Sequence, residues 1–209
     1  MEFEKQLKQA LEELRKEKKR KFNQTIDLIV NFQKYSHKKN PINLFVTVPH
    51  KVKEKKVAAF FQSKSDFVDT ITLDEFKKYN DKKELKFLVK KYDFFIAQGI
   101  LMPKVATTFG RVLGPAGKMP SPQLGIILNA DEKSISDLKV KINTSVKIRV
   151  KESCVKLAVG KESMKDEEII ENIMSIYNEL IKALPREKEN IKNVELKFTM
   201  TKPQKIRIR

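Results

Sequence analysis

The 209-residue sequence predicts an α+β protein of two domains, one inserted into the other. Segments with alternating apolar residues lie near both ends of the chain, as expected for half-buried antiparallel strands. Segments that are apolar throughout lie between them and alternate with helical patterns, as expected for parallel strands covered on both faces. We therefore expect a discontinuous terminal domain, residues 1–50 and 144–209, and an inserted α/β domain, residues 51–143.

The first part of the terminal domain is predicted to contain one helix and two strands. The stretches TIDLIVNF (25–32) and INLFVTV (42–48) alternate in polarity, and Pro49 ends the second because proline has no N–H for a ladder. Residues 1–19 form an amphipathic helical pattern, with one apolar face made by Phe3, Leu7, Ala10, Leu11 and Leu14.

The inserted domain is predicted from two apolar strands and the helices around them. The strands are KVAAFF (56–61) and YDFFIA (92–97). A capping-box pattern, Thr72-x-x-Glu75, opens one helix, and another helix begins around Pro103. The following stretch, RVLGPAGKMPSP (111–122), is predicted to be a rigid turn, because glycine permits unusual backbone angles and proline fixes them.

The last part of the chain is predicted to return to antiparallel strands. Between Val140 and Val150 aliphatic residues take nearly every even position and basic residues occupy odd ones, which predicts a strand with a basic face. CVKLAVG (154–160) is a second strand. Ser163-x-x-Asp166 is predicted to cap a long helix, and NVELKFT (193–199) is predicted as the last strand.

The charge balance predicts a polyanionic partner. Lys and Arg total 44 against 27 Asp and Glu, giving a net charge of +17. A lysine-rich solvated surface is the alternative, but two basic clusters, RKEKKRK (15–21) and the tail from Lys197, favour nucleic acid. There is no run of about 18 apolar residues and no secretory signal, so neither a membrane span nor export is expected. One cysteine and two histidines predict no disulfide framework, no metal site and a reduced, cytosolic compartment.

An enzyme is not expected. Gly117-Lys118 has the last pair of a nucleotide-binding P-loop, but the required first glycine is replaced by Val112 and the required hydroxyl residue by Met119. The loop also leads to Pro120 instead of a helix that would bind phosphate. The dinucleotide pattern Gly-x-Gly-x-x-Gly is absent, and no other catalytic constellation or cofactor site is recognisable.

Five segments resemble the family of ribosomal protein L-one, the lateral-stalk protein of the large subunit, in its archaeal and eukaryotic branch. The most specific is KYDFFIAQGILMPKVATTFGRVLGPAGKMPSP, which ends in the family's Leu-Gly-Pro-x-Gly-Lys-Met-Pro run. The others, in chain order, are RKFNQTIDL (20–28), TVPH (47–50), LAVGKESMKDEEIIENI (157–173) and LKFTMTKP (196–203).

The resemblance implies an antiparallel-sheet α/β sandwich with an inserted three-layer Rossmann-like α/β domain. It implies a structural, cytoplasmic rRNA-binding protein, monomeric when free, that forms the mobile lateral stalk and assists release of deacylated tRNA. It also implies repression of translation through the protein's own mRNA. It implies no enzyme activity, cofactor, metal, membrane or small-molecule substrate. The alternative is a free-standing RNA-binding regulator or chaperone.

The resemblance and the residue chemistry together predict the sites. Thr201 and Ala116 depart from the family, which usually has Gly and Arg there. The expected RNA-binding residues are Lys19, Arg20, Lys21, Phe22, Thr25, Asp27, Lys156, Gly160, Lys161, Thr199, Met200, Thr201 and Lys202. The inserted-domain loop, either structural or a secondary RNA contact, comprises Arg111, Gly114, Pro115, Gly117 and Lys118, and the hinge comprises Pro49, His50, Asn143 and Thr144.

Overall fold

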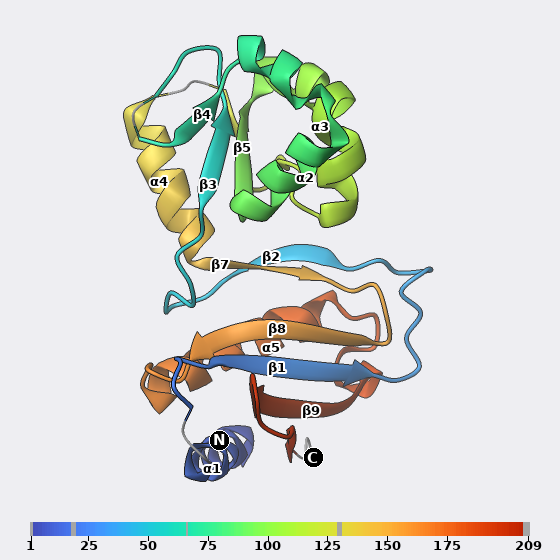
Figure 1. The fold of residues 1–209 in the computed structure, drawn as a ribbon. Coiled ribbons are helices and arrows are strands. Elements are labelled where there is room, and N and C mark those ends of the chain that lie inside the picture. The colour runs from blue at the N-terminus through green and yellow to red at the C-terminus, as the bar shows by residue number, and fades with distance from the viewer. Residues whose placement is uncertain (1, 18–19, 66, 129–130, 207–209) are drawn as a thin grey trace. The chain divides into compact units, whose positions relative to one another are not determined.

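The computed structural model describes residues 2–17, 20–65, 67–128 and 131–206, and it shows two compact units (Figure 1). The terminal unit contains Met1–Lys53 and Thr144–Arg209, and the inserted unit contains Glu54–Asn143. The sheets of the terminal unit are antiparallel and that of the inserted unit is parallel. The predicted α+β fold class is therefore confirmed.

The terminal unit is built on a four-stranded sheet in the order β10-β9-β1-β8. Helix α5 lies behind this sheet in the view of Figure 1 and α1 lies along its lower edge. A separate two-stranded ribbon is formed by β2 and β7. The elements are α1 (Glu2–Lys16), β1 (Thr25–Phe32), β2 (Asn43–Thr47), β7 (Ser145–Arg149), β8 (Cys154–Lys161), α5 (Asp166–Ala183), the 3₁₀ turn η3 (Glu187–Asn190), β9 (Ile191–Phe198) and β10 (Gln204–Ile206).

The alternation in β1 divides the sheet into a buried and an open face. Ile26, Leu28, Val30 and Phe32 are buried, whereas the residues between them are half-buried. The buried face packs on α1 and α5, and Phe3 stacks on Tyr177 with ring centroids 4.7 Å apart. The open face carries the alternate residues of β1, β8 and β9, and it is the surface from which the candidate site is built.

The inserted unit has three layers, with α2 and α3 on one face of a parallel sheet and α4 on the other (Figure 1). The strand order is β4-β3-β5-β6. Buried aromatic rings of Phe60, Phe76, Phe95 and Phe109 form its core. The elements are β3 (Val57–Phe60), β4 (Asp69–Ile71), η1 (Leu73–Asn80), α2 (Lys82–Lys91), β5 (Phe94–Gln98), η2 (Gly99–Leu101), α3 (Met102–Ala116), β6 (Ile126–Ile127) and α4 (Glu132–Asn143).

The predicted Gly/Pro turn is wrong over residues 111–116, because α3 continues to Ala116. The helix ends at Gly117, whose φ of 71° lies in the left-handed region. The amide of Gly117 donates to the Gly114 carbonyl and that of Lys118 to the Leu113 carbonyl, both at 3.0 Å. This is the Schellman arrangement, in which glycine at the left-handed position satisfies the last helical carbonyls.

Two other boundaries differ from the prediction. Residues 140–143 are helical in α4, so the strand begins only at Ser145. Helix α4 buries Ile135 and Ile142, which lie seven residues apart on one helical face. The sheet also gains an edge strand, β10, beyond the segment predicted as the last strand.

The start of α5 also differs from the prediction. The helix begins at Asp166, and the amide of Lys165 donates to Glu168 Oε2 at 3.3 Å. Ser163 does not cap the helix, since its hydroxyl accepts from Asn23 Nδ2 at 2.8 Å.

We expect Gly117→Ala to destabilise the inserted unit by about 1 kcal/mol, because an alanine in the left-handed region is strained. Gly110→Ala is the matched change in the same helix. Nothing lies within 4 Å of a Cβ placed there, so it should instead stabilise by roughly 0.5–1 kcal/mol. Thermal unfolding followed by circular dichroism should show opposite shifts of a few °C, and equal shifts would contradict the assigned helix end.

Candidate nucleic-acid interface

The open face of the sheet mixes basic and acidic side chains in cross-strand rows. Asp27 on β1 lies opposite Lys197 on β9, and Ile29 lies between Lys156 on β8 and Glu195 on β9. Burial raises the pKa of the Asp27 carboxyl, and Lys197 opposes that shift. Lys156 is exposed, so its ammonium group is available to a phosphate.

One end of this face is closed by the turn that follows β9. Thr199 donates its amide to the Thr25 carbonyl at 3.0 Å, and its hydroxyl accepts from the Thr25 amide at 3.1 Å. The Thr201 hydroxyl accepts from the Phe198 amide at 2.9 Å. Each hydroxyl therefore holds the turn in the free protein, and the assignment of Thr199 and Thr201 to RNA binding stays a prediction. Thr201 has a structural reason to stand where the family usually has Gly.

Met200 and Phe22 are the exposed apolar side chains at this end of the sheet. Met200 is 57% exposed at the tip of its turn, and Phe22 is 51% exposed just before β1. Arg20, Lys21 and Lys202 are also exposed. Aromatic and apolar surface beside cations suits stacked bases with nearby phosphates. Lys19, which was predicted to join them, lies outside the described residues.

Gln24 joins three segments of the interface. Its side chain is 2% exposed. The amide nitrogen Nε2 donates to Glu162 Oε2 at 3.3 Å, and the amide oxygen Oε1 accepts from the Met200 N–H at 3.2 Å. The chain before β1, the loop after β8 and the turn after β9 are therefore held together. Sequence reasoning missed this residue, because a polar residue beside a strand carries no sign of burial.

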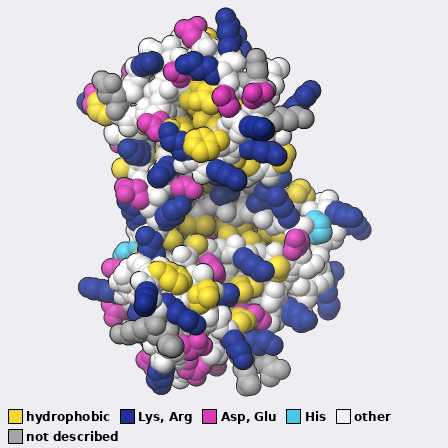
Figure 2. Space-filling model, in the orientation of Figure 1, with side chains coloured by type: hydrophobic (Ala, Val, Ile, Leu, Met, Phe, Trp, Pro, Cys, Tyr) yellow, Lys and Arg dark blue, Asp and Glu magenta, His cyan; other side chains and the backbone are white. Residues whose placement is uncertain are grey.

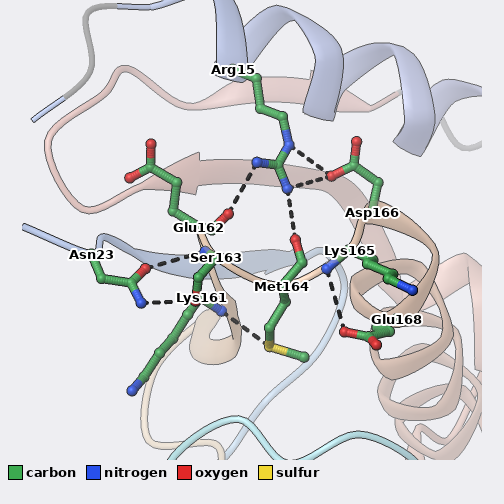
Figure 3. A network of polar contacts seen from close by, with 9 residues as sticks. All are labelled: Arg15, Asn23, Lys161, Glu162, Ser163, Met164, Lys165, Asp166 and Glu168. Carbon is green, nitrogen blue, oxygen red and sulfur yellow. Dashed lines mark hydrogen bonds and ion pairs between the residues drawn. The ribbon is translucent and has the colours of Figure 1, made fainter.

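The loop after β8, residues 162–165, is held by Arg15 of α1 (Figure 3). In the Arg15 guanidinium, Nε donates to Asp166 Oδ1 at 2.8 Å and Nη2 lies 2.6 Å from the same oxygen. It also donates to the carbonyl of Glu162 at 3.0 Å and to that of Met164 at 2.9 Å. Arg15 belongs to the basic cluster assigned to RNA, yet its donors are used inside the protein. Lys161 is the last residue of β8, just before the loop, and its side chain extends away from the network (Figure 3).

Gly160, one of the predicted RNA-binding residues, has a packing role in the structure. It is buried beside the β-bulge at Ile26 and Asp27. A Cβ at this position would lie 3.0 Å from Ile169 Cγ1. Packing of α5 against β8 therefore explains the glycine without a ligand.

The predicted loop of the inserted unit contains no phosphate cradle. Arg111, Gly114 and Pro115 lie within α3. The Lys118 ammonium donates to the carbonyls of Val89 at 2.7 Å and Tyr92 at 2.8 Å. It therefore caps the carbonyl end of α2, where a cation is favourable.

The predicted hinge residues take part in backbone bonding. The Val48 amide donates to the Thr144 carbonyl at 2.7 Å, extending the β2–β7 ribbon. Asn172, fully buried on α5, accepts from the His50 amide and donates to the His50 carbonyl, both at 3.0 Å. In the inserted unit, Asn143 Oδ1 accepts from the Lys55 amide at 3.0 Å. The hinge role of Pro49, His50, Asn143 and Thr144 stays a prediction.

Other kinds of site find no support within the part of the chain that the structure describes. No group of three or more His, Cys, Asp or Glu side chains is placed to hold a metal ion there. No described helix has the length and apolar character needed to cross a membrane.

The sequence was compared with known proteins. Residues 14–202 match the model of the Ribosomal protein L1p/L10e family. The large ribosomal subunit protein uL1 of Pyrobaculum islandicum is 38% identical, with 94% of this chain and 90% of the relative covered. The uL1 proteins of Nanoarchaeum equitans and Thermococcus kodakarensis are 35% and 33% identical. Those alignments cover 89% and 96% of this chain, and 92% and 96% of the respective relatives.

We expect Asp166→Asn to weaken binding of a large-subunit rRNA fragment roughly twofold to fivefold, the equivalent of a half-exposed ion pair. The loop that follows Lys161 would lose the Arg15–Asp166 ion pair, one of the contacts that hold it, and would be less ordered before binding. Pure charge effects predict the opposite sign, because the change removes an acid near a polyanion.

Glu167→Gln is the matched control for this experiment. Glu167 is an exposed acid in the same first turn of α5, and its neutralisation should leave affinity unchanged or slightly higher. Affinity is to be measured by fluorescence anisotropy of labelled RNA. Tighter binding by both variants would show that the Arg15 network has no positioning role.

Proposed function

The chain belongs to the ribosomal protein L1p/L10e family, and from this premise we propose that it builds the mobile lateral stalk and assists release of deacylated tRNA. Family membership and the uL1 relatives make it a structural, rRNA-binding protein of the large ribosomal subunit in the cytoplasm, not an enzyme. The proposal adds which surface binds the stalk rRNA and what the protein does once it is there.

The observation that carries the proposal is the exposed pair Phe22 and Met200 at one end of an open sheet face. Both side chains are more than half exposed and have cations nearby, an arrangement that suits stacked bases with their phosphates. Gln24, two residues after Phe22, accepts from the Met200 amide and donates to Glu162, so the backbone at Met200 is held in place before RNA arrives. A preordered surface loses less conformational entropy on binding. Unpaired bases stacked on these side chains, with phosphates near Arg20, Lys21 and Lys156, fit that arrangement.

Repression of the protein's own mRNA is the second part of the proposal. Stacking surfaces and cations read RNA shape and unpaired bases, and not its ribosomal context. A message that presents the same fold as the stalk rRNA would therefore occupy the same surface. Ribosome binding and repression would compete for one site.

Sedimentation separates the ribosomal assignment from a free-standing regulator or chaperone. In native lysate, the protein should migrate with large subunits at moderate salt and leave them at high salt, because phosphate contacts release counterions. A protein that stays at the top of the gradient while it still binds RNA would favour the free-standing regulator.

We expect Phe22→Ala to weaken binding of the stalk rRNA fragment roughly fivefold to a hundredfold, the loss of one base–aromatic stack. Met200→Ala should act in the same direction. Both side chains are more than half exposed, so melting temperatures should change little. Ile100→Ala is the control, since Ile100 is 71% exposed on the inserted unit. Unchanged affinity in both variants, or loss of folding instead of affinity, would remove this surface from the proposal.

A further inference from the structure

The inserted unit has a hollow of about 580 Å³ between η1 and α2. We propose that this hollow binds an unpaired nucleotide of the same RNA, with the base stacked on Phe87 and the phosphates near lysines. The proposal rests on the RNA-binding function above and adds a second contact on the other unit. The hollow is lined by Lys78, Tyr79, Lys83, Glu84, Phe87, Leu88, Lys91 and Tyr92.

Phe87 is not needed by the core of its unit. Leu85 and Leu88 are the side chains that α2 buries, at 7% and 4% exposure. Phe87 lies on a different side of the helix and is 70% exposed. A large exposed aromatic ring at the wall of a hollow is a ready stacking platform, because every base has a π-face.

Tyr92, which also lines the hollow, is held in place by two neighbouring side chains. The Tyr92 hydroxyl donates to Asp69 Oδ2 at 2.7 Å. The Lys91 ammonium lies 4.9 Å from the centre of the Tyr92 ring. Burial raises the pKa of the Tyr92 hydroxyl. A volume of this size falls in the range of small-molecule sites, and a single nucleotide fits it.

The charges around the hollow select a polyanion. Five of the ten residues of α2 are lysine and one is glutamate. Of these, Lys83, Lys91 and Glu84 line the hollow, and Lys78 joins them from η1, so three lysines stand against one acid. A protein partner would call for a wider apolar patch, whereas one exposed ring surrounded by ammonium groups matches one base and its phosphates. Figure 2 shows exposed hydrophobic side chains amid Lys and Arg on this unit.

A second, neighbouring hollow could take the next nucleotide of the bound RNA. Tyr79 lines both the first hollow and a neighbouring one of about 540 Å³. The second is lined by Lys86, Thr107, Thr108 and Arg111, among others. Arg111 of α3, which the sequence analysis offered as a secondary RNA contact, therefore lies where it could contact the second nucleotide. The two hollows form a track for consecutive nucleotides, with the Tyr79 ring between them.

The test uses Phe87→Trp in the full chain. The protein contains no tryptophan, so the introduced indole reports on this hollow alone. We expect a short single-stranded oligoribonucleotide of mixed sequence to quench its emission, while the same RNA as a duplex quenches little. Phe67→Trp is the control, because Phe67 is 53% exposed on the same unit but does not line the hollow. Its emission should not change.

A second variant tests the lysines. Adding Lys83→Ala and Lys91→Ala to Phe87→Trp should weaken the quenching titration roughly tenfold and lower the slope of log affinity against log salt by roughly 1.4. Anisotropy of labelled RNA is followed in the same samples. RNA that binds by anisotropy without quenching would overturn this inference and leave the proposed function intact. If neither this RNA nor the stalk rRNA fragment binds at all, both the inference and the proposed function are overturned. Quenching by an acidic peptide but not by RNA would assign the hollow to a protein partner.

Discussion

Strand β1 is hydrogen-bonded along both edges to strands from the other end of the chain. Its partners are β8 on one side and β9 on the other, in antiparallel register. Neither half of the terminal unit therefore has a complete sheet alone. The same strand sorts its side chains by alternation, placing Ile26, Leu28 and Val30 in the core and Thr25 and Asp27 on the open face. The core, the open face and the turn after β9, which is bonded to Thr25, all depend on this register.

Near the interface, residue type was a poor guide to the role of a side chain. Arg15 lies in a basic cluster and Thr199 and Thr201 in a family motif, yet all three direct their donors and acceptors into the protein. In each case a neighbouring residue is the one available to RNA. Arg15 holds the loop next to Lys161, and Thr199 and Thr201 hold the turn that contains Met200. A guanidinium or hydroxyl that could serve RNA serves equally well to hold a loop, and the bonding pattern decides between these roles.

The pattern of apolar residues predicted strands well where it fitted a strand and not also a helix. The strand at 25–32 has the predicted bounds, because its alternation has no helical reading. Val140 to Ile142 fit both a strand of even positions and a helix that buries Ile135 and Ile142, and tertiary packing chose the helix. Gly114 and Pro115 suggested a turn, but α3 accepts a proline in its last turn and ends one residue after it. The side-chain bonds of Gln24 and Asn172 had no local signal at all.

The position of β1 also constrains how the protein folds as it is synthesised. The chain makes β1 early, but both neighbours come after the whole inserted unit. The parallel sheet of that unit is complete once α4 has emerged, and it is free to fold as a body while β1 still has two unpaired edges. An alternating apolar strand in that state is exposed to wrong pairing. Slow closure of distant strands is expected to limit the folding rate of the terminal unit, and a bound chaperone or early RNA contact would protect β1 in that interval.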